Sequence, residues 1–189
     1  MDADGCPHAY ALPGSGLRGC DYLGNAHRDP RDLSSPWCGV VVGDDGEPLV
    51  QITTDPCPGY LVSTTSLQDV TWPVRDPRRY VDSDNVPYLA VPPELLELGV
   101  RMGDLALVEK GDRSCAAVVA DRGPRRHLGE GSMALARALD VDPDPRRGGC
   151  SGGVLWSVWP GTSKGWPRDM SDVGRDVMSA LGLKSGSVA

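Results

Sequence analysis

The sequence lacks several features, and each absence narrows the class of protein. None of its 189 residues is phenylalanine, and tryptophan and tyrosine number only five each. No apolar stretch approaches the ~20 residues that a membrane-spanning helix needs, so we predict no membrane partner. Lysine and arginine never form a long cluster and the net charge is −7, which disfavours a nucleic-acid partner.

Signatures of metal and nucleophile chemistry are also missing. The three histidines are far apart, with neither H-E-x-x-H nor C-x-x-C spacing, so we predict no metal and no cofactor. The hydroxyl run 63–66, "STTS", lacks the G-x-S-x-G pattern of a serine nucleophile. We expect its side chains, Ser66 in particular, to hydrogen-bond strand neighbours or a sugar. The first ten residues lack the basic and apolar regions of a signal peptide, so a secreted protein would have lost its leader already.

Glycine and proline are abundant, at 24 and 17 residues, which favours short strands joined by turns over a helical bundle. Helical patterns cover 132–139, a short turn at 93–99 and, more weakly, 170–182. We predict one domain over residues 1–189, mainly β and closed into a small barrel, with 170–189 as a C-terminal extension. Runs of strand character lie at 38–42, 49–54, 59–66, 86–91, 104–110, 115–120 and 154–160.

Six cysteines stand at 6, 20, 38, 57, 115 and 150. An even number, widely spread, is typical of a disulfide framework in a secreted protein, although six cysteines allow fifteen pairings. Buried free thiols are the alternative.

Two carboxylates bracket the loop 122–129. Asp121 ends an apolar run, where desolvation would raise its pKa, and Glu130 stands at an expected helix start, where the helix dipole would favour its ionised form. Such a divergence of pKa values suits an acid/base pair, with Asp121 as proton donor and Glu130 as the base that activates water. Ordinary turn and capping roles are the alternative interpretation.

Seven stretches in order over about residues 2–161 resemble glycoside hydrolase family 75, the fungal-type chitosanases, and its bacterial relatives. They are "MDADG…HAY", "DYLGNA", "GYLVSTTSLQD", "DPRRYVDSDNVPYLAVP", "GVRMGDLALV", "ADRGP" and "GEGSMALARAL". The family's catalytic motifs fall on Asp121 and Glu130, and the resemblance implies inverting, endo-acting hydrolysis of chitosan. The loop between the two residues is shorter than in fungal members.

The resemblance offers an interpretation of the net negative charge, because chitosan is a polycation and carboxylates could bind its ammonium groups. We expect Asp2, Asp4, Asp82 and Asp84 in that role. Trp72 and Tyr80, from a long connection over 67–85, are candidate sugar platforms. Arg125, Arg126 and His127 put positive charge near the expected cleft, which does not suit a cationic polymer.

A fainter likeness, to the three-aspartate domain of some lytic transglycosylases, implies a six-stranded double-psi β-barrel with Asp121 at the mouth of a groove. It also supplies a second candidate activity, cleavage of peptidoglycan glycan strands. A non-catalytic, wall-associated glycan-binding module is the third possibility. We expect a secreted monomer in each case.

Overall fold

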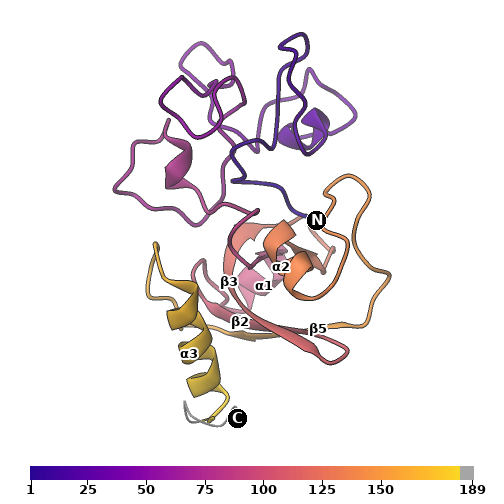
Figure 1. The fold of residues 1–189 in the computed structure, drawn as a ribbon, viewed down its shortest axis with the longest axis vertical. Helices are drawn as coiled ribbons and strands as arrows, with labels where there is room; N and C mark the ends of the chain where they lie inside the picture. The colour runs from indigo at the N-terminus through magenta and orange to yellow at the C-terminus, as the bar shows by residue number, and fades with distance from the viewer. Residues whose placement is uncertain (184–189) are drawn as a thin grey trace.

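The computed structural model describes residues 1–183 and divides into a layer of loops and a layer of sheet and helices. In Figure 1 residues up to about 85 form the upper, looped part, and the regular elements lie below it. The N-terminus lies between the two layers. The elements are η1 (Leu23–Ala26), η2 (Pro77–Arg79), β1 (Tyr88–Val91), α1 (Pro93–Glu97), β2 (Leu105–Lys110), β3 (Arg113–Arg122), β4 (Glu130–Gly131), α2 (Met133–Ala138), β5 (Val154–Trp159) and α3 (Met170–Ala180).

The sheet has five strands in the order β4-β1-β3-β2-β5. Strands β1 and β3 are parallel and the other pairs are antiparallel. The β2–β3 hairpin turns at Gly111, whose φ of 62° suits glycine. Within residues 1–183 the two edge strands, β4 and β5, do not pair, so the structure does not confirm a closed six-stranded barrel. The prediction of a small, mainly β fold with few helices is confirmed at that coarser level.

The core lies on both faces of the central strands. All four residues of β1 are buried, as expected of a strand covered on both sides. One face packs Leu89, Ala106 and Val119 against α2, and the other packs Tyr88, Val118 and Ala120 against α3. The ends of β1 and β3 are therefore held rigidly.

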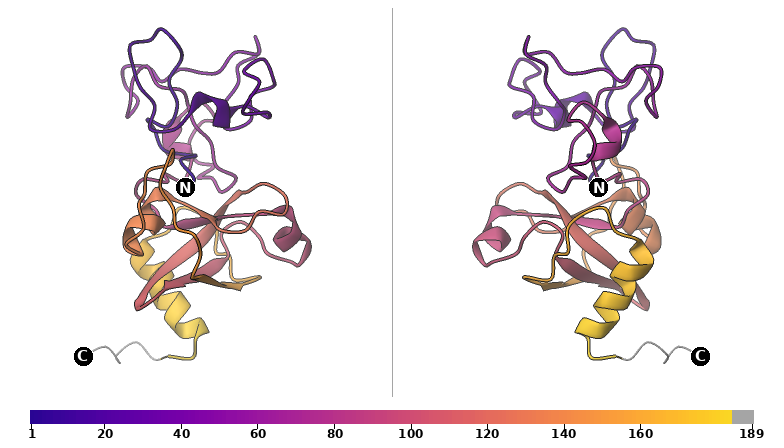
Figure 2. Two further views of the ribbon diagram at one scale, coloured as in Figure 1. Left: turned by 90° about the vertical axis from the view of Figure 1, so that its right-hand side faces the viewer. Right: turned by 90° about the vertical axis from the view of Figure 1, so that its left-hand side faces the viewer.

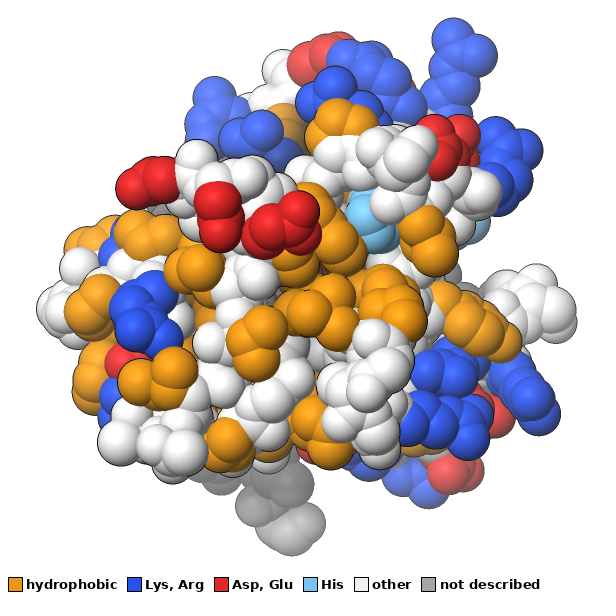
Figure 3. All heavy atoms as spheres, turned by 90° about the horizontal axis from the view of Figure 1, so that it is seen from above, with side chains coloured by type: hydrophobic (Ala, Val, Ile, Leu, Met, Phe, Trp, Pro, Cys, Tyr) orange, Lys and Arg blue, Asp and Glu red, His pale blue; other side chains and the backbone are white. Residues whose placement is uncertain are grey.

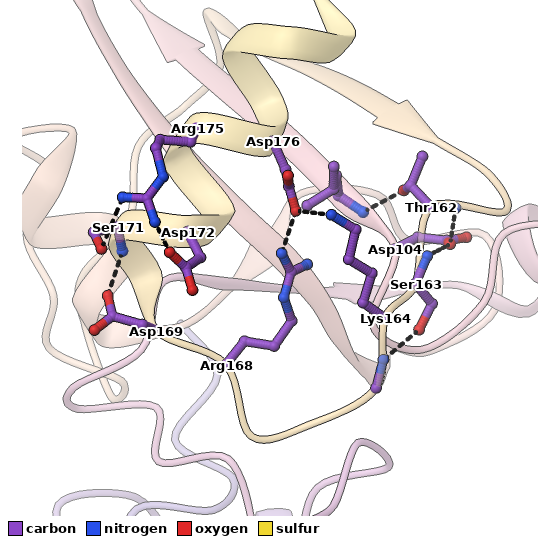
Figure 4. A network of polar contacts seen from close by, with 12 residues as sticks. Asp104, Thr162, Ser163, Lys164, Arg168, Asp169, Ser171, Asp172, Arg175 and Asp176 are labelled. Carbon is purple, nitrogen blue, oxygen red and sulfur yellow. Dashed lines mark hydrogen bonds and ion pairs between the residues drawn. The ribbon is translucent and has the colours of Figure 1, made fainter. Parts of the chain in front are cut away.

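Helix α3 belongs to this core. Val173 and Val177, four residues apart, are buried against β3 and β2, and Figure 2 shows the helix running along the sheet. The segment before it is fixed by Asp104, whose Oδ1 accepts from the N–H groups of Thr162 (2.9 Å) and Ser163 (3.0 Å) (Figure 4). The predicted extension 170–189 is thus integral to the domain up to α3, and its residues 184–189 lie outside the described part.

The loop layer replaces three of the expected strands. Residues 38–42, 49–54 and 59–66 lie outside the sheet, with turns at 53–54 and at Gly59, and they pair only through isolated bridges such as Val40 with Ser63 and Val50 with Leu61. The turn predicted after 42 is present, since Leu49 donates its N–H to the carbonyl of Val41. Proline and glycine interrupt these runs too often for regular ladders. In Figure 3 hydrophobic side chains occupy much of the middle of this end of the molecule, and most Lys and Arg side chains lie toward its rim.

The structure does not confirm the predicted disulfide framework. All six cysteines are free thiols; Cys6 is buried, whereas Cys38 and Cys150 are exposed. No helix in residues 1–183 has both the length and the apolar character that crossing a bilayer demands.

Candidate active site

Asp121 and Glu130 lie on either side of the same residue of β1. Ala90 pairs in parallel with Asp121 of β3 and antiparallel with Glu130 of β4. Neighbouring strands lie about 4.8 Å apart, so the two Cα atoms are separated by about 10 Å. The register slips between Leu89 and Ala90, an irregularity of the kind found beside active sites. The backbone thus brings together the two carboxylates that the sequence singled out.

One oxygen of Asp121 is fully engaged by hydrogen bonds. Its Oδ1 accepts from the Ser66 hydroxyl at 2.7 Å, the Ser66 N–H at 3.1 Å and the Arg122 N–H at 2.8 Å. Burial and the nearby charge of Asp2 together raise the pKa of Asp121 to about 7, although the hydrogen bonds from Ser66 and Arg122 lower it. The expected raised pKa is present, and Oδ2 is the oxygen left to carry a proton.

Glu130 differs from expectation, because it lies in a strand and does not begin a helix. Ser132 is the N-cap of α2, with its side chain accepting from the Leu135 N–H, so the helix dipole does not act directly on Glu130. Burial and the charges of Asp2 and Asp121 raise its pKa to about 7. The predicted divergence of the two pKa values is therefore wrong: the environments raise both.

Gly123 keeps room for the Glu130 carboxylate. A Cβ at Gly123 would lie 3.0 Å from Glu130 Oε2 and 3.1 Å from the carbonyl oxygen of Ala90. The absence of a side chain two residues after Asp121 thus allows Glu130 to fold back toward β3 and β1.

The N-terminal segment adds two more carboxylates. Asp2 donates its N–H to the carbonyl of Gly131 at 2.9 Å and bridges to Ser132, so this segment runs beside β4. Oxygen atoms of Asp2, Asp4 and Asp121 all lie within 4.8 Å of one another. Desolvation raises the pKa of Asp2 and, with the charge of Asp2, that of Asp4. Three carboxylates this close repel one another when all are ionised, which favours the uptake of a proton by the cluster.

Oxygen ligands of this kind suit a hard cation or an ammonium group. A cavity of about 390 Å³ gives access to Asp4 and Asp121, and it is lined by Asp4, Cys38, Gly39, Thr64, Thr65, Ser66, Gln68, Asp121 and Arg122. A larger cavity of about 630 Å³ lies beyond Glu130, between α2 and β5, and its lining is mainly apolar. The smaller cavity presents Asp121, Asp4 and several hydroxyl and amide groups, whereas among the described residues Glu130 and Asp2 line neither cavity.

Tyr10 was not predicted, yet it orients this cluster. Its hydroxyl donates to Asp4 Oδ1 at 2.7 Å, and the ring is 2% exposed. The only signal in the sequence is its place in the "HAY" that closes the first of the seven stretches quoted above, which does not reveal a contact with Asp4.

The remaining predicted ligands lie elsewhere or have other roles. Ser66 lines the cavity but holds Asp121, so its position favours orienting that residue. Asp84 forms an ion pair with Arg137 at 2.7 Å. Asp82 accepts from the Asp84 N–H and the Asn85 side chain. Among the described residues, neither of these two aspartates lines the smaller cavity.

The two aromatic candidates are engaged in packing. The Arg78 guanidinium lies 4.0 Å from the centre of the Trp72 ring and covers one face of it. Tyr80 is 6% exposed, packs with Val41 and Val62, and donates its hydroxyl to the Val74 carbonyl at 2.8 Å. These positions favour structural roles over sugar stacking for both side chains.

One of the three basic residues of the 125–127 loop, Arg125, forms ion pairs with α1. Arg125 lies 3.6 Å from Glu94 and 3.7 Å from Glu97, measured between guanidinium nitrogens and carboxylate oxygens. Since α1 follows the end of β1, this pairing directs the Arg125 charge toward the helix. The conflict with a cationic substrate is reduced accordingly.

Neither the scan against protein-family models nor the search of curated proteins finds a match for this chain.

Proposed function

We propose that this protein is an endo-acting, inverting glycoside hydrolase that cleaves β-1,4 linkages of chitosan. The observation that carries the proposal is the flanking of Ala90 by Asp121 and Glu130. Cα atoms about 10 Å apart are compatible with the 6.5–9.5 Å carboxyl separation, roughly, that leaves space for a water molecule in inverting enzymes. The resemblance to family 75 points to the same pair of residues.

In this mechanism Asp121 is the general acid. Its Oδ1 is fixed by Ser66 and Arg122, so Oδ2 would present the proton to the glycosidic oxygen. Asp2 and Asp4, within 4.8 Å, favour retention of that proton until the leaving group takes it. Glu130, across Ala90, would be the base that removes a proton from the attacking water.

The pH dependence follows from the two raised pKa values. Activity requires protonated Asp121 and ionised Glu130, each with a pKa of about 7. The two carboxyls interact, so a plot of the rate against pH should be a narrow bell with its maximum near pH 7. The two apparent pKa values of this bell describe the coupled pair and not one residue each. Flat activity from pH 5 to pH 9 would contradict the acid/base assignment.

The acidic wall supports a cationic substrate. Asp4 lines the smaller cavity beside Asp121, and the net charge of −7 would attract a polycation. An ammonium group on glucosamine can donate hydrogen bonds to such a carboxylate. We propose that the protein is secreted, because the polymer lies outside cells. The proposal also takes the protein to act as a monomer.

The test is release of reducing ends from chitosan, chitin and peptidoglycan by the wild-type protein, Asp121→Asn and Glu130→Gln. We expect cleavage of chitosan by the wild type and loss of at least 1000-fold, in order of magnitude, in both variants, with unchanged thermal unfolding. Preference for peptidoglycan would indicate the second candidate activity. Sugar binding without cleavage would indicate a glycan-binding module.

A glycosyl fluoride separates the two catalytic roles, because fluoride leaves without protonation. Asp121→Asn should regain activity on a chitooligosaccharide fluoride, whereas Glu130→Gln should stay inactive. The opposite pattern would exchange the roles of acid and base.

We also propose that the fold is the double-psi β-barrel implied by the likeness to the three-aspartate domain. Residues 63–67 run beside the end of β3, where Leu67 donates its N–H to the Ala120 carbonyl at 2.8 Å. We propose that this segment corresponds to the sixth strand of a double-psi barrel. The catalytic proposal needs only β1, β3 and β4.

A further inference from the structure

Two backbone segments in the loop layer bring a pair of cysteines together. Cys20 donates its N–H to the carbonyl of His8 at 3.0 Å, and Asp21 donates to the carbonyl of Ala9 at 3.1 Å. Cys6 lies at the start of the same turn, because the Ala9 N–H donates to its carbonyl at 3.0 Å. As a result, the sulfur atoms of Cys6 and Cys20 lie within 4.8 Å of each other.

The surroundings of the pair suit thiol–disulfide exchange. Cys6 is fully buried, whereas Cys20 is partly exposed and can meet a reagent from solvent. The hydrogen bond to Cys20 and burial raise the pKa of the Cys6 thiol, so Cys6 is the protonated partner, and its sulfur lies 3.3 Å from Nδ1 of His8, a base within reach of that proton. The hydrogen bond from Cys6 lowers the pKa of the Cys20 thiol, which increases its thiolate fraction.

We propose that Cys6 and Cys20 form a disulfide bond that closes the N-terminal loop of the protein. The oxidant is a disulfide, either of a small thiol or of an oxidoreductase. The Cys20 thiolate attacks one sulfur of the oxidant and releases one thiol. The Cys6 sulfur, losing its proton to His8, then attacks the mixed disulfide and releases the second thiol. Two protein thiols are oxidised and one disulfide is reduced to two thiols.

The bond would secure the segment that carries the acidic cluster. The turn around Cys6 is tied to the Asp4 region, since the Gly5 N–H donates to the Ser63 hydroxyl at 3.0 Å and Tyr10 holds Asp4. The loop around Cys20 is tied to the C-terminal half, because Arg146 donates to the carbonyls of Gly19 and Cys20. The strand-like pairing in the loop layer consists of isolated bridges, so a covalent link there would strongly restrict the conformational freedom of its backbone.

A shared metal ion is a weaker interpretation of the same residues. Cys6, His8 and Cys20 supply three donors, whereas structural zinc sites take four. The Cys6 sulfur lies 3.3 Å and 3.8 Å from the two ring nitrogens of His8. It therefore lies alongside the ring, and not where both it and one ring nitrogen would face a common metal ion. The proposed disulfide is independent of the proposed function, so a test of one does not decide the other.

The test is peptide mapping of the full-length protein after incubation with glutathione disulfide, without reduction before alkylation. We expect the peptides containing Cys6 and Cys20 to be joined, and the joined species to separate on reduction. Reduction should lower the melting temperature by roughly 5–10 °C in the wild type. The Cys6→Ser/Cys20→Ser double variant should show no such change, and Cys115→Ser, altered on β3, should behave like the wild type.

Complete alkylation of both residues in the oxidised sample, or a joined peptide with a different partner, would overturn the proposal. Zinc at one equivalent, measured by mass spectrometry of the purified protein and lost in the double variant, would overturn it in favour of the metal.

Discussion

At the scale of single residues, the site depends on how Asp121 is held. Three donors converge on its Oδ1, and two of them come from Ser66, which lies 55 positions earlier in the chain. Hydrogen bonds to one oxygen orient the other, so in the proposed mechanism Ser66 acts as a positioning residue. The sequence predicted Asp121 and Ser66 separately, but it held no information that joins them.

Replacement of Ser66 tests this role. Ser66→Ala removes the 2.7 Å hydroxyl contact and keeps both N–H donors. We expect kcat to fall about tenfold, and the pKa of Asp121 to rise, because a hydrogen bond that lowers it is lost. The measurement is kcat as a function of pH. Ser66→Thr, which keeps the hydroxyl, should recover most of the rate; a wild-type profile for Ser66→Ala would refute the role.

The raised pKa of Asp121 also affects stability. The folded protein binds its proton up to pH about 7, whereas the unfolded chain releases it near pH 4. The resulting stability is fully present below pH 4 and is lost as pH rises through 7. Asp121→Asn has no such loss. Between pH 5 and pH 8 its free energy of unfolding should therefore rise by about 2 kcal/mol relative to that of the wild type.

Urea unfolding at the two pH values measures this difference. Asp176→Asn is the control, because its ion pairs with Lys164 and Arg168 lower the pKa of Asp176 and place its titration below pH 5. A pH dependence of Asp121→Asn identical to that of the wild type would show that Asp121 is ionised in the folded protein.

At the scale of elements, the sheet register brings the carboxylates together and the loops leave space between them. Apolar runs predicted β1, β2, β3 and β5 within a few residues, because their alternation and turns are local properties. Glu130 was misassigned because glutamate is common in a first helical turn, yet Ser132 is the stronger N-cap and begins the helix two residues later. Pairing of β4 with β1 is a long-range property that no local pattern encodes.

Glycine substitutions test the space around Glu130. Gly123→Ala places a Cβ 3.0 Å from Glu130 Oε2, so the carboxylate must move. We expect kcat to fall about 10- to 100-fold with the fold retained. Gly174→Ala, in α3 with nothing within 4 Å of its Cβ, should leave activity unchanged and stabilise the protein by about 0.5–1 kcal/mol. Equal activity of the two variants would contradict the crowding argument.

At the scale of the whole molecule, a rigid sheet supports a loop layer whose contacts converge on the N-terminal segment. The sequence predicted regular strands in the loop layer, but these segments pair through single bridges. Strand propensity therefore overestimates the regularity of this layer. Helix α3 was predicted from Val173 and Val177, although its integration into the core was not.

Core packing of α3 gives a prediction at this scale. Val173→Ala removes two methyl-sized groups from a fully buried side chain and should lower the free energy of unfolding by about 2 kcal/mol. Chemical denaturation measures the loss. Ser179→Ala, exposed on the same helix, should change stability by less than about 0.5 kcal/mol. A negligible effect of Val173→Ala would mean that α3 is dispensable.

The most direct test of the central claim is proton NMR of the first products formed from chitosan by the wild-type protein, Asp121→Asn and Glu130→Gln. Two carboxylates flanking Ala90, with a water molecule between Glu130 and the sugar, predict that the wild type releases the α-anomer first and that both variants release almost nothing. Initial release of the β-anomer, or near-wild-type cleavage by either variant, would contradict the account.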